Sequence, residues 1–421
     1  MGILRKDPII FVIGCTGTGK SDLGVAIAKN YGGEIVSVDS MQLYKGLDIA
    51  TNKITSEETE GIPHHMMSIL QPFSKTRYNV HLFRQQVLEI CQQIRERRKI
   101  PILVGGTTYY AESILYENNI IETGNVGSSS TSGSDSEPEK DQEFEADSRI
   151  SNEDLWSELN RVDPETASLL HKNNRHRVWR AIQIYKQTGK KRSEIILQQK
   201  SNKNDVELGG KLRFEDSLVI YLDAKKEVLE ERLDSRVEKM IGMGLKKELV
   251  EFYELHKNHL DENSFGVMQC IGWKEFVPWL KLEEKREENM KLFEEGCEKM
   301  KTRTKQYAKH QRLWYFSRLL KRANGERKMA STKMLDTSEK SRIISDGLKI
   351  VDEWMLGNDL HEDVNMSNEQ NIGEHLHRFI ECEICEMRVQ GSVNWKLHLA
   401  GKTHKHHLKM RKKLAENVEN Q

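Results

Sequence analysis

The sequence predicts an α/β fold: a doubly wound parallel sheet with an inserted helical domain and a C-terminal Cys2His2 zinc finger. Three observations predict this fold. Short apolar runs alternate with helical patterns, and a glycine-rich motif follows the first apolar run. Near the end of the chain, two cysteines and two histidines stand at the spacing of metal ligands.

The first element is a strand followed by a phosphate-binding loop. Residues 8–13 are mostly apolar, and residues 14–21 read Gly-Cys-Thr-Gly-Thr-Gly-Lys-Ser, a Gly-x4-Gly-Lys-Ser motif. Gly14 and Gly19 let backbone N–H groups close on a phosphate. Lys20 supplies a positive charge, and Ser21 can hold a magnesium ion. A helical pattern follows at once, so we predict a P-loop for a diphosphate or triphosphate rather than an ordinary glycine-rich turn.

Four apolar runs predict buried parallel strands, at residues 9–13, 34–38, 100–104 and 218–222. Helical patterns separate them, notably at residues 20–30 and 80–98. Ligands of such sheets bind at the carboxyl ends of the strands. Three polar clusters follow strand ends, and we expect them to share one crevice: the P-loop, Asp39-Ser40-Met41-Gln42 and Gly105-Gly106-Thr107-Thr108.

An interruption of the sheet pattern predicts an inserted domain. We assign residues 8–115 and 214–322 to the P-loop core and residues 116–213 to a helical insertion. Residues 122–149 hold eight acids and two bases among many Ser and Gly, so we expect a disordered acidic loop there. After it, Ser151-Asn152-Glu153-Asp154 resembles a capping box, and a second helix is expected at 175–188.

The second half of the chain predicts one long helix. Apolar residues recur at three-, four- and seven-residue spacings within residues 285–322, which gives one apolar face: Phe293, Cys297, Met300, Tyr307 and Trp314.

Beyond that helix, we assign residues 323–374 to a helix, at 341–356, and a linker. Residues 375–414 are assigned to a zinc finger with a basic tail. Cys382-x2-Cys385-x12-His398-x5-His404 fits a tetrahedral zinc site. Four protein ligands fill the coordination sphere, so this zinc is expected to be structural, with Trp395 and Leu399 as a small core. A single finger reads only about three base pairs, so with its basic tail it suits a clamp on structured RNA.

Composition restricts the partners and the compartment. The 421 residues hold 65 Lys+Arg and 65 Asp+Glu, so the net charge indicates no partner. Residues 297–328 hold eleven bases and two acids, and residues 387–415 hold eight bases and no acid. Solvated helix faces are the ordinary explanation of such runs, but beside a P-loop they favour nucleic acid.

Six scattered cysteines indicate a reducing compartment. No apolar run has transmembrane length, and seven residues before the first strand leave no room for a signal peptide. We therefore expect a soluble, monomeric, cytoplasmic protein without membrane contact, with the nucleus and mitochondria left open as further compartments.

Further motifs stand in order along the chain: Val38-Asp39-Ser40-Met41-Gln42-Leu43-Tyr44-Lys45-Gly46-Leu47-Asp48, Thr51-Asn52-Lys53, Gly61-Ile62-Pro63-His64-His65, Val104-Gly105-Gly106-Thr107-Thr108-Tyr109-Tyr110, Arg177-Val178-Trp179-Arg180, Arg232-Leu233-Asp234-Ser235-Arg236-Val237, Ile271-Gly272-Trp273-Lys274-Glu275-Phe276 and Thr302-Arg303-Thr304-Lys305-Gln306-Tyr307-Ala308. With the P-loop and the finger, they resemble the tRNA dimethylallyltransferases (tRNA isopentenyltransferases) in their eukaryotic form with a C-terminal zinc finger.

The resemblance implies transfer of a dimethylallyl group from dimethylallyl diphosphate to N6 of the adenosine just 3′ of the anticodon, with release of diphosphate. It implies that the tRNA anticodon stem-loop is the partner. A diphosphate leaving group also suits the P-loop predicted from the residues themselves. The target base is expected to be flipped out, because chemistry on a stacked base is blocked.

The resemblance also implies residue roles. Asp39 would take the N6 proton as the C–N bond forms, since an ordinary Asp is too weak a base to deprotonate an amine outright. Thr18 and Arg236 would act in catalysis with it, Arg236 through a bidentate contact to the diphosphate. The diphosphate and Mg²⁺ would be held by Gly14, Thr16, Gly17, Thr18, Gly19, Lys20 and Ser21, with Ser21 as the Mg²⁺ ligand. The tRNA would be contacted by Asp39, Ser40, Met41, Gln42, Thr107, His176, Arg177, Val178, Trp179, Arg180, Arg303 and Lys305.

Some positions depart from the family pattern. Lys305 and His310 stand where relatives often carry Arg, which weakens a forked phosphate contact. Trp179 replaces a usually polar residue and could stack on a base or pack in a core. His64 and His65 are expected to be loop structure rather than metal ligands, because no Cys or carboxylate stands at ligand spacing.

Two other functions stay open on sequence grounds. A P-loop kinase acting on a nucleoside or an RNA end would share the loop and the fold. An RNA-binding scaffold with a vestigial P-loop would share the basic segments and the finger. Labelled ATP would identify the first alternative. RNA modification unchanged by Asp39→Asn would identify the second.

Overall fold

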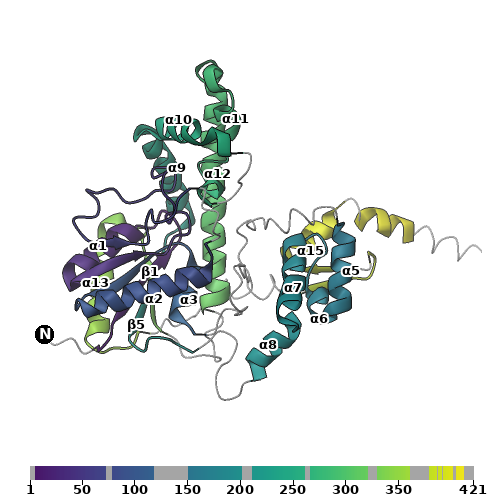
Figure 1. The fold of residues 1–421 in the computed structure, drawn as a ribbon, viewed down its shortest axis with the longest axis horizontal. Helices are drawn as coiled ribbons and strands as arrows, with labels where there is room; N and C mark the ends of the chain where they lie inside the picture. Colours follow the sequence, from purple (N-terminus) through teal and green to yellow (C-terminus); the bar gives the residue numbers. More distant parts are fainter. Residues whose placement is uncertain are drawn as a thin grey trace, which may run out of the picture. The chain divides into compact units, whose positions relative to one another are not determined.

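A computed structural model describes residues 5–72, 78–117, 150–201, 211–260, 266–320, 330–360, 379–385, 387–390, 392–401 and 404–411 (Figure 1). The chain divides into two compact units, which are described separately below. The first comprises Met1–Tyr315 with Arg322–Glu362, and the second comprises Phe316–Lys321 with Asp363–Gln421. The predicted acidic loop at residues 122–149 lies outside the described residues. The domain boundaries proposed from the sequence stay predictions.

The first unit is built on a six-stranded sheet, and the predicted doubly wound parallel fold is confirmed. The strand order is β3-β2-β4-β1-β5-β6, and neighbouring strands pair in parallel. The strands are β1 (Ile9–Gly14), β2 (Gly33–Ser37), β3 (His64–His65), β4 (Ile100–Gly105), β5 (Ser217–Asp223) and β6 (Ser331–Asp336). Every residue of β1, β2, β4 and β5 is buried, as their continuous apolar runs predict.

Two edge strands were not predicted. β3 has only two residues, so no periodicity can identify it, and the expectation of loop structure at His64 and His65 was wrong. β6 reads Ser-Thr-Lys-Met-Leu-Asp, with Lys333 partly exposed and Met334 37% exposed. An edge strand with a solvent-facing side carries a mixed pattern of this kind. The prediction of only a helix and a linker at residues 323–374 therefore missed strand β6.

Helices cover both faces of the sheet. Leu23 of α1 (Lys20–Tyr31) and Trp354 of α13 (Ile343–Met355) share one core with Ile10 and Val12 of β1. Strand residues alternate between faces, so Phe11 belongs to the other face. There, α2 (Val80–Glu96) and α3 (Thr108–Leu115) contact β4 and β1. Crossover connections between parallel strands are right-handed. The connection from β1 to β2 and the connection back to β4 run in opposite directions along the sheet, so α1 and α2 lie on opposite faces.

The long predicted helix is α12 (Met290–Trp314), which continues as a π-helix at Tyr315–Leu320. It starts later than predicted because Glu283–Lys285 and Glu287–Asn289 form separate 3₁₀ turns. Phe293, Cys297 and Met300 are buried as expected. The same unit contains α9 (Lys226–Gly242), α10 (Leu245–His256) and α11 (Val277–Leu280).

The insertion is helical as predicted. It contains α5 (Asn152–Val162), α6 (Pro164–Leu169), α7 (Arg175–Thr188) and α8 (Arg192–Ser201). The predicted N-cap is confirmed, because Ser151 Oγ accepts a hydrogen bond of 3.1 Å from the Asp154 N–H. A bridge between Tyr116 and Leu212 joins the two ends of the insertion.

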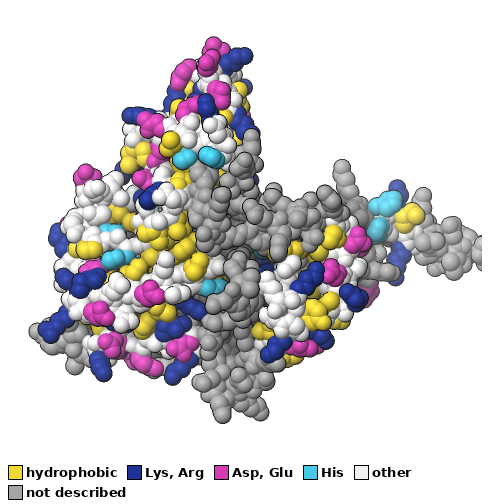
Figure 2. Space-filling view, viewed as in Figure 1, with side chains coloured by type: hydrophobic (Ala, Val, Ile, Leu, Met, Phe, Trp, Pro, Cys, Tyr) yellow, Lys and Arg dark blue, Asp and Glu magenta, His cyan; other side chains and the backbone are white. Residues whose placement is uncertain are grey.

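The described surface carries mixed charge. Figure 2 shows Lys and Arg interspersed with Asp and Glu on the side in view, as the equal totals of acids and bases lead us to expect. Among the described helices, none is both long and apolar enough to cross a bilayer.

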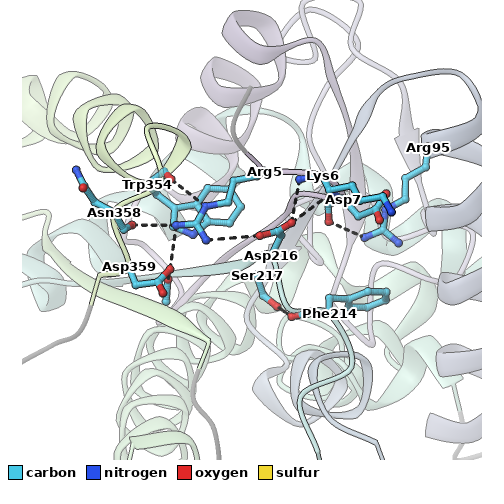
Figure 3. Close-up of polar contacts among 11 residues, drawn as sticks. Arg5, Lys6, Asp7, Arg95, Phe214, Asp216, Ser217, Trp354, Asn358 and Asp359 are labelled. Carbon is cyan, nitrogen blue, oxygen red and sulfur yellow. Dashed lines mark hydrogen bonds and ion pairs between the residues drawn. The ribbon is translucent and has the colours of Figure 1, made fainter. Parts of the chain in front are cut away.

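Arg5 ties the start of the described chain to the sheet (Figure 3). Its guanidinium donates to Trp354 O at 3.1 Å and Asp359 Oδ1 at 2.9 Å, and it lies 5.0 Å from the centroid of the Trp354 ring. Asp216, just before β5, accepts from Arg5 Nη1 at 3.5 Å and from the Lys6 N–H at 3.0 Å. With its side chain only 11% exposed, Arg5 joins three segments that are distant in sequence.

We expect Arg5→Ala to lower the free energy of unfolding by about 1–3 kcal/mol, because the carbonyl and ring of the buried Trp354 and two carboxylates lose their partner. Lys6→Ala is the matched control, since Lys6 contacts Asp216 through its backbone N–H. Chemical denaturation of both variants measures the difference. Equal stability of Arg5→Ala and Lys6→Ala would show that the side-chain contacts of Arg5 do not stabilise the fold.

Candidate active site and zinc centre

The P-loop lies between β1 and α1. Gly17 and Gly19 have φ of 84°, a left-handed conformation that glycine adopts without strain. A Cβ on Gly14 would lie 2.2 Å from Leu222 O of β5, so only glycine fits there. Thr18 Oγ1 and Lys20 Nζ both donate to Cys15 O, at 2.8 Å and 2.5 Å, and hold the turn closed.

Three charged residues act on one another at this loop: Lys20 within it, Arg236 and Asp39. Arg236 on α9 donates through Nη1 to Thr16 Oγ1. Burial lowers the pKa of Lys20 to about 8, with a further contribution from Arg236, whereas Asp39 opposes the shift. Burial also lowers the pKa of Arg236 to about 10, again opposed by Asp39. Asp39 therefore favours the charged forms of both bases, and Arg236 is held against the loop that carries Lys20.

Asp39 follows β2 and faces this cationic pair. Burial raises the pKa of its carboxyl, while a 3.0 Å hydrogen bond from the Met41 N–H and the charges of Lys20 and Arg236 lower it. The balance keeps the carboxyl a stronger proton acceptor than an ordinary Asp. A carboxyl with a shifted pKa and two cationic neighbours is typical of functional sites.

The third strand-end cluster joins the same site. Thr107 Oγ1 accepts from the Ser40 N–H at 3.2 Å, and the Thr107 N–H donates to Val38 O at 3.1 Å. A Cβ on Gly105 would lie 2.0 Å from Val38 O, which explains the glycine. The structure thus brings together the three polar clusters that the strand-end rule placed in one crevice.

Gln42 is part of the loop beyond Asp39. Its Oε1 accepts from Ser37 Oγ at 2.9 Å, and its Nε2 donates to Asn52 O at 3.1 Å. Lys53 stabilises the same loop, because its ammonium donates to Tyr44 O and to Ser68 Oγ. Ser40 and Met41 are partly exposed at this edge.

Sequence reasoning missed the contribution of α12. Gln311 accepts from the Thr16 N–H at 2.8 Å and donates to Gly106 O at 2.9 Å. Tyr307, which was assigned to the apolar face, carries a hydroxyl whose pKa is raised by burial and lowered by the neighbouring Thr107 and Gln311 side chains. The available signal was a tyrosine on that face, since a buried phenol needs a polar partner.

Asp223 was also missed, although the strand-end rule applies to it. It ends β5 and pairs through Oδ2 with Arg312 Nε at 2.9 Å.

The predicted tRNA contacts on α7 divide into two groups. Val178 and Trp179 are 0% and 2% exposed and belong to the core of the helical insertion, so packing explains Trp179 and the side chains of both face away from solvent. Arg180 is 6% exposed, and burial lowers its pKa. Only His176 and Arg177 of this group are partly exposed.

On α12, Arg303 is exposed, whereas Lys305 Nζ lies 2.7 Å from Asp234 Oδ2. A phosphate would therefore compete with Asp234 for Lys305. His65 Nε2 lies 2.8 Å from Glu34 Oε2, which agrees with a structural role for that histidine.

The second unit contains the zinc centre. β7 (Phe379–Cys382) and β8 (Met387–Gln390) form an antiparallel pair, and α15 (Ser392–Ala400) carries His398. One ligand atom from each of Cys382, Cys385, His398 and His404 lies within 4.8 Å of the others. His404 Nδ1 lies 3.4 Å from Cys382 Sγ, 3.5 Å from Cys385 Sγ and 3.1 Å from His398 Nε2.

These distances fit zinc. With Zn–S of about 2.3 Å and Zn–N of about 2.0–2.1 Å, the N–N and S–N edges of a tetrahedron are about 3.3–3.6 Å and the S–S edge is about 3.8 Å. The side chains of Cys382 and His404 are buried, and the Trp395 ring stacks on His398 at 5.7 Å. The expected packing role of Leu399 was wrong, because this side chain is 38% exposed.

Comparisons with known proteins agree with this geometry. The family model described as IPP transferase matches residues 42–318, and the zinc-finger model of C2H2 type matches residues 380–404. The chain is 35% identical to a tRNA dimethylallyltransferase of Mus musculus, covering 98% of this chain and 88% of the relative. It belongs to the tRNA dimethylallyltransferase family. A Homo sapiens member of the family is 34% identical, with 100% and 90% covered.

Solved structures of the family agree. A eukaryotic dimethylallyltransferase acting on tRNA superposes with a TM-score of 0.75 at 30% identity, covering 98% of this chain and 99% of that chain. A tRNA isopentenylpyrophosphate transferase of Staphylococcus epidermidis gives 0.51 at 29% identity, covering 84% and 100%. The agreement with the eukaryotic structure extends over nearly the whole chain.

Proposed function

We propose that this chain transfers the dimethylallyl group of dimethylallyl diphosphate to N6 of the adenosine 3′-adjacent to the anticodon of tRNA. The products are N6-isopentenyladenosine and diphosphate. One observation carries the proposal: Arg236 is hydrogen-bonded to Thr16 of the P-loop, and the charges of Arg236 and of Lys20 in that loop act on the Asp39 carboxyl. An anion-binding turn and a proton acceptor in one site are what this reaction requires. Family membership supports the same reaction.

The P-loop side of the site would hold the donor. As the allylic C–O bond breaks, its electron pair leaves with the diphosphate, and the growing negative charge is stabilised by backbone N–H groups, Lys20 and Arg236. Arg236 is already held against Thr16 Oγ1, so its guanidinium is oriented before the donor binds. Thr18, by closing the turn on Cys15 O, orients the loop N–H groups rather than the prenyl group.

Mg²⁺ fits the start of α1. Ser21 is exposed and follows Lys20 directly, so its hydroxyl can serve as a metal ligand next to a bound diphosphate. A bound Mg²⁺ would neutralise charge on the leaving diphosphate.

Asp39 would act on the acceptor. The N6–C bond forms while an N6 proton passes to the carboxylate, so proton and charge balance in one step. Ser40, Met41, Gln42 and Thr107 lie around Asp39 and would contact the flipped base. Arg303, His176 and Arg177 would contact phosphates, as would the finger. We further propose a monomeric protein of a reducing compartment, since no disulfide joins its six cysteines and two of them, Cys382 and Cys385, belong to the zinc centre.

The pH dependence of catalysis follows from two pKa shifts. Activity needs an ionised Asp39, so kcat/KM for dimethylallyl diphosphate should rise with pH through a pKa above the ordinary Asp value. It should fall as Lys20 loses its proton above about pH 8 in the free enzyme. We expect Lys20→Arg to move the alkaline limb to higher pH. An alkaline limb at the same pH in both proteins would show that deprotonation of Lys20 is not what lowers the activity, and would contradict its role in binding the donor.

The decisive experiment is mass spectrometry of tRNA nucleosides. Purified protein, unmodified tRNA, dimethylallyl diphosphate and Mg²⁺ should yield N6-isopentenyladenosine, and a chelator of Mg²⁺ should suppress it. Family membership does not favour the kinase alternative. Transfer of label from γ-labelled ATP to RNA, without prenylation, would overturn the proposed function.

A further inference from the structure

Gln311 occupies a buried position between two turns of the site. It is 7% exposed and lies on α12, 295 residues from its partner Thr16. Its amide oxygen accepts from the Thr16 N–H at 2.8 Å, and its amide nitrogen donates to Gly106 O at 2.9 Å. One side chain therefore joins the P-loop to the turn that follows β4.

The backbone leaves a fitted space for this amide. A Cβ on Gly106 would lie 2.2 Å from Gln311 Nε2, so the close approach depends on glycine. Among neutral side chains of this length, only a primary amide accepts from an N–H and donates to a C=O at the same time. A carboxylate could accept from Thr16 but would place its negative charge against Gly106 O. A methionine of similar length would make neither hydrogen bond.

Polar contacts extend from Gln311 across the site. Burial raises the pKa of the Tyr307 hydroxyl, and the Thr107 and Gln311 side chains beside it lower that pKa. Thr107 Oγ1 in turn accepts from the Ser40 N–H at 3.2 Å, next to Asp39. At the other end, Thr16 Oγ1 accepts from Arg236. Polar contacts therefore lie at both ends of Gln311, toward the acceptor segment and toward the donor loop.

We propose that Gln311 is a positioning residue that sets the distance and angle between the donor diphosphate and the acceptor base. The inference rests on the proposed function of the two turns and adds the element that couples them. The Thr16 N–H is satisfied by Gln311, so Gln311 acts through the loop rather than by touching the substrate. A displacement of about 1 Å between reacting groups costs about a hundredfold in rate, so loss of this bridge should act on the chemical step.

The test uses the full-length protein with two substitutions and a control. Gln311→Met should lower kcat by about 10- to 100-fold, with the KM for tRNA within about threefold of wild type. Gln306→Met is the matched control on the same helix, because Gln306 is exposed, and it should keep kcat. Gln311→Glu should be impaired at about pH 8 and should recover relative to wild type as the pH falls, because a protonated carboxyl both accepts and donates.

The outcomes separate three explanations. Wild-type kcat in Gln311→Met would overturn the proposal. So would a lowered kcat with no pH-dependent recovery in Gln311→Glu and a melting temperature far below that of wild type, which would indicate a purely structural role. If Gln311→Met does not fold, two other measurements test the proposal. Gln311→Glu should recover activity relative to wild type as the pH falls, and Tyr307→Phe should have a lowered kcat; failure of both would overturn the proposal. Absence of prenylation by the wild type itself would instead overturn the proposed function.

Discussion

Asp39→Asn is expected to lower the rate of prenyl transfer by several orders of magnitude while tRNA affinity changes by less than about threefold. The amide keeps the size of the carboxylate but cannot take the N6 proton, so the C–N bond would have to form on an amine that retains its proton. General base catalysis of this kind contributes about 10²–10⁴-fold. Loss of the charge facing Lys20 and Arg236 adds to the effect.

The stability of this variant provides an internal control. Folding raises the pKa of the Asp39 carboxyl, so between its unfolded and folded pKa values the folded state binds more protons. Stability therefore falls as the pH rises through that window. Asparagine does not titrate, so the variant does not lose stability in this way. At neutral pH, Asp39→Asn should therefore unfold at the same or a higher denaturant concentration than wild type.

Single-turnover transfer of labelled dimethylallyl and filter binding of tRNA measure the two effects separately. Asp22→Asn is the matched control, since Asp22 is exposed on the first turn of α1 near the P-loop. A rate for Asp39→Asn within about tenfold of wild type would show that another group, or water, accepts the proton.

Strand-end chemistry explains how much of this site could be predicted. Each inner strand is a continuous apolar run, so its end is visible in the sequence, and parallel strands bring their carboxyl ends to one edge. The P-loop, Asp39 and Thr107 were therefore placed correctly relative to one another. The resemblance to a family added Arg236, which lies in the middle of a helix where no local pattern distinguishes it.

The contributions of α12 could not be predicted in the same way. Gln311 meets Thr16 across 295 residues of chain, and nothing in its neighbourhood in the sequence indicates which turn of the helix faces the P-loop. Helical periodicity identifies an apolar face, and it placed Tyr307 on that face without its polar neighbours. The edge strands β3 and β6 were missed for a related reason, because their pairing depends on the neighbouring strand.

The zinc centre carries the second large expected effect. His404→Ala should weaken tRNA binding by about tenfold or more, because a finger that loses one of four ligands no longer folds around its metal. The exposed bases of the finger, Lys405 and Lys409 among them, would then lose their fixed arrangement. Fewer simultaneous phosphate contacts also predict a smaller dependence of affinity on salt concentration.

Chemistry should be preserved in the same variant. The finger and the P-loop belong to separate compact units, so kcat at saturating tRNA should stay within about threefold of wild type while the KM for tRNA rises. His406→Ala is the matched control, because His406 is exposed in the same helical segment and is not one of the four ligands. A lower kcat at saturating tRNA with unchanged affinity would mean that the finger acts on the reacting groups rather than on the RNA. Zinc content measured on both variants links the loss of affinity to the loss of the metal.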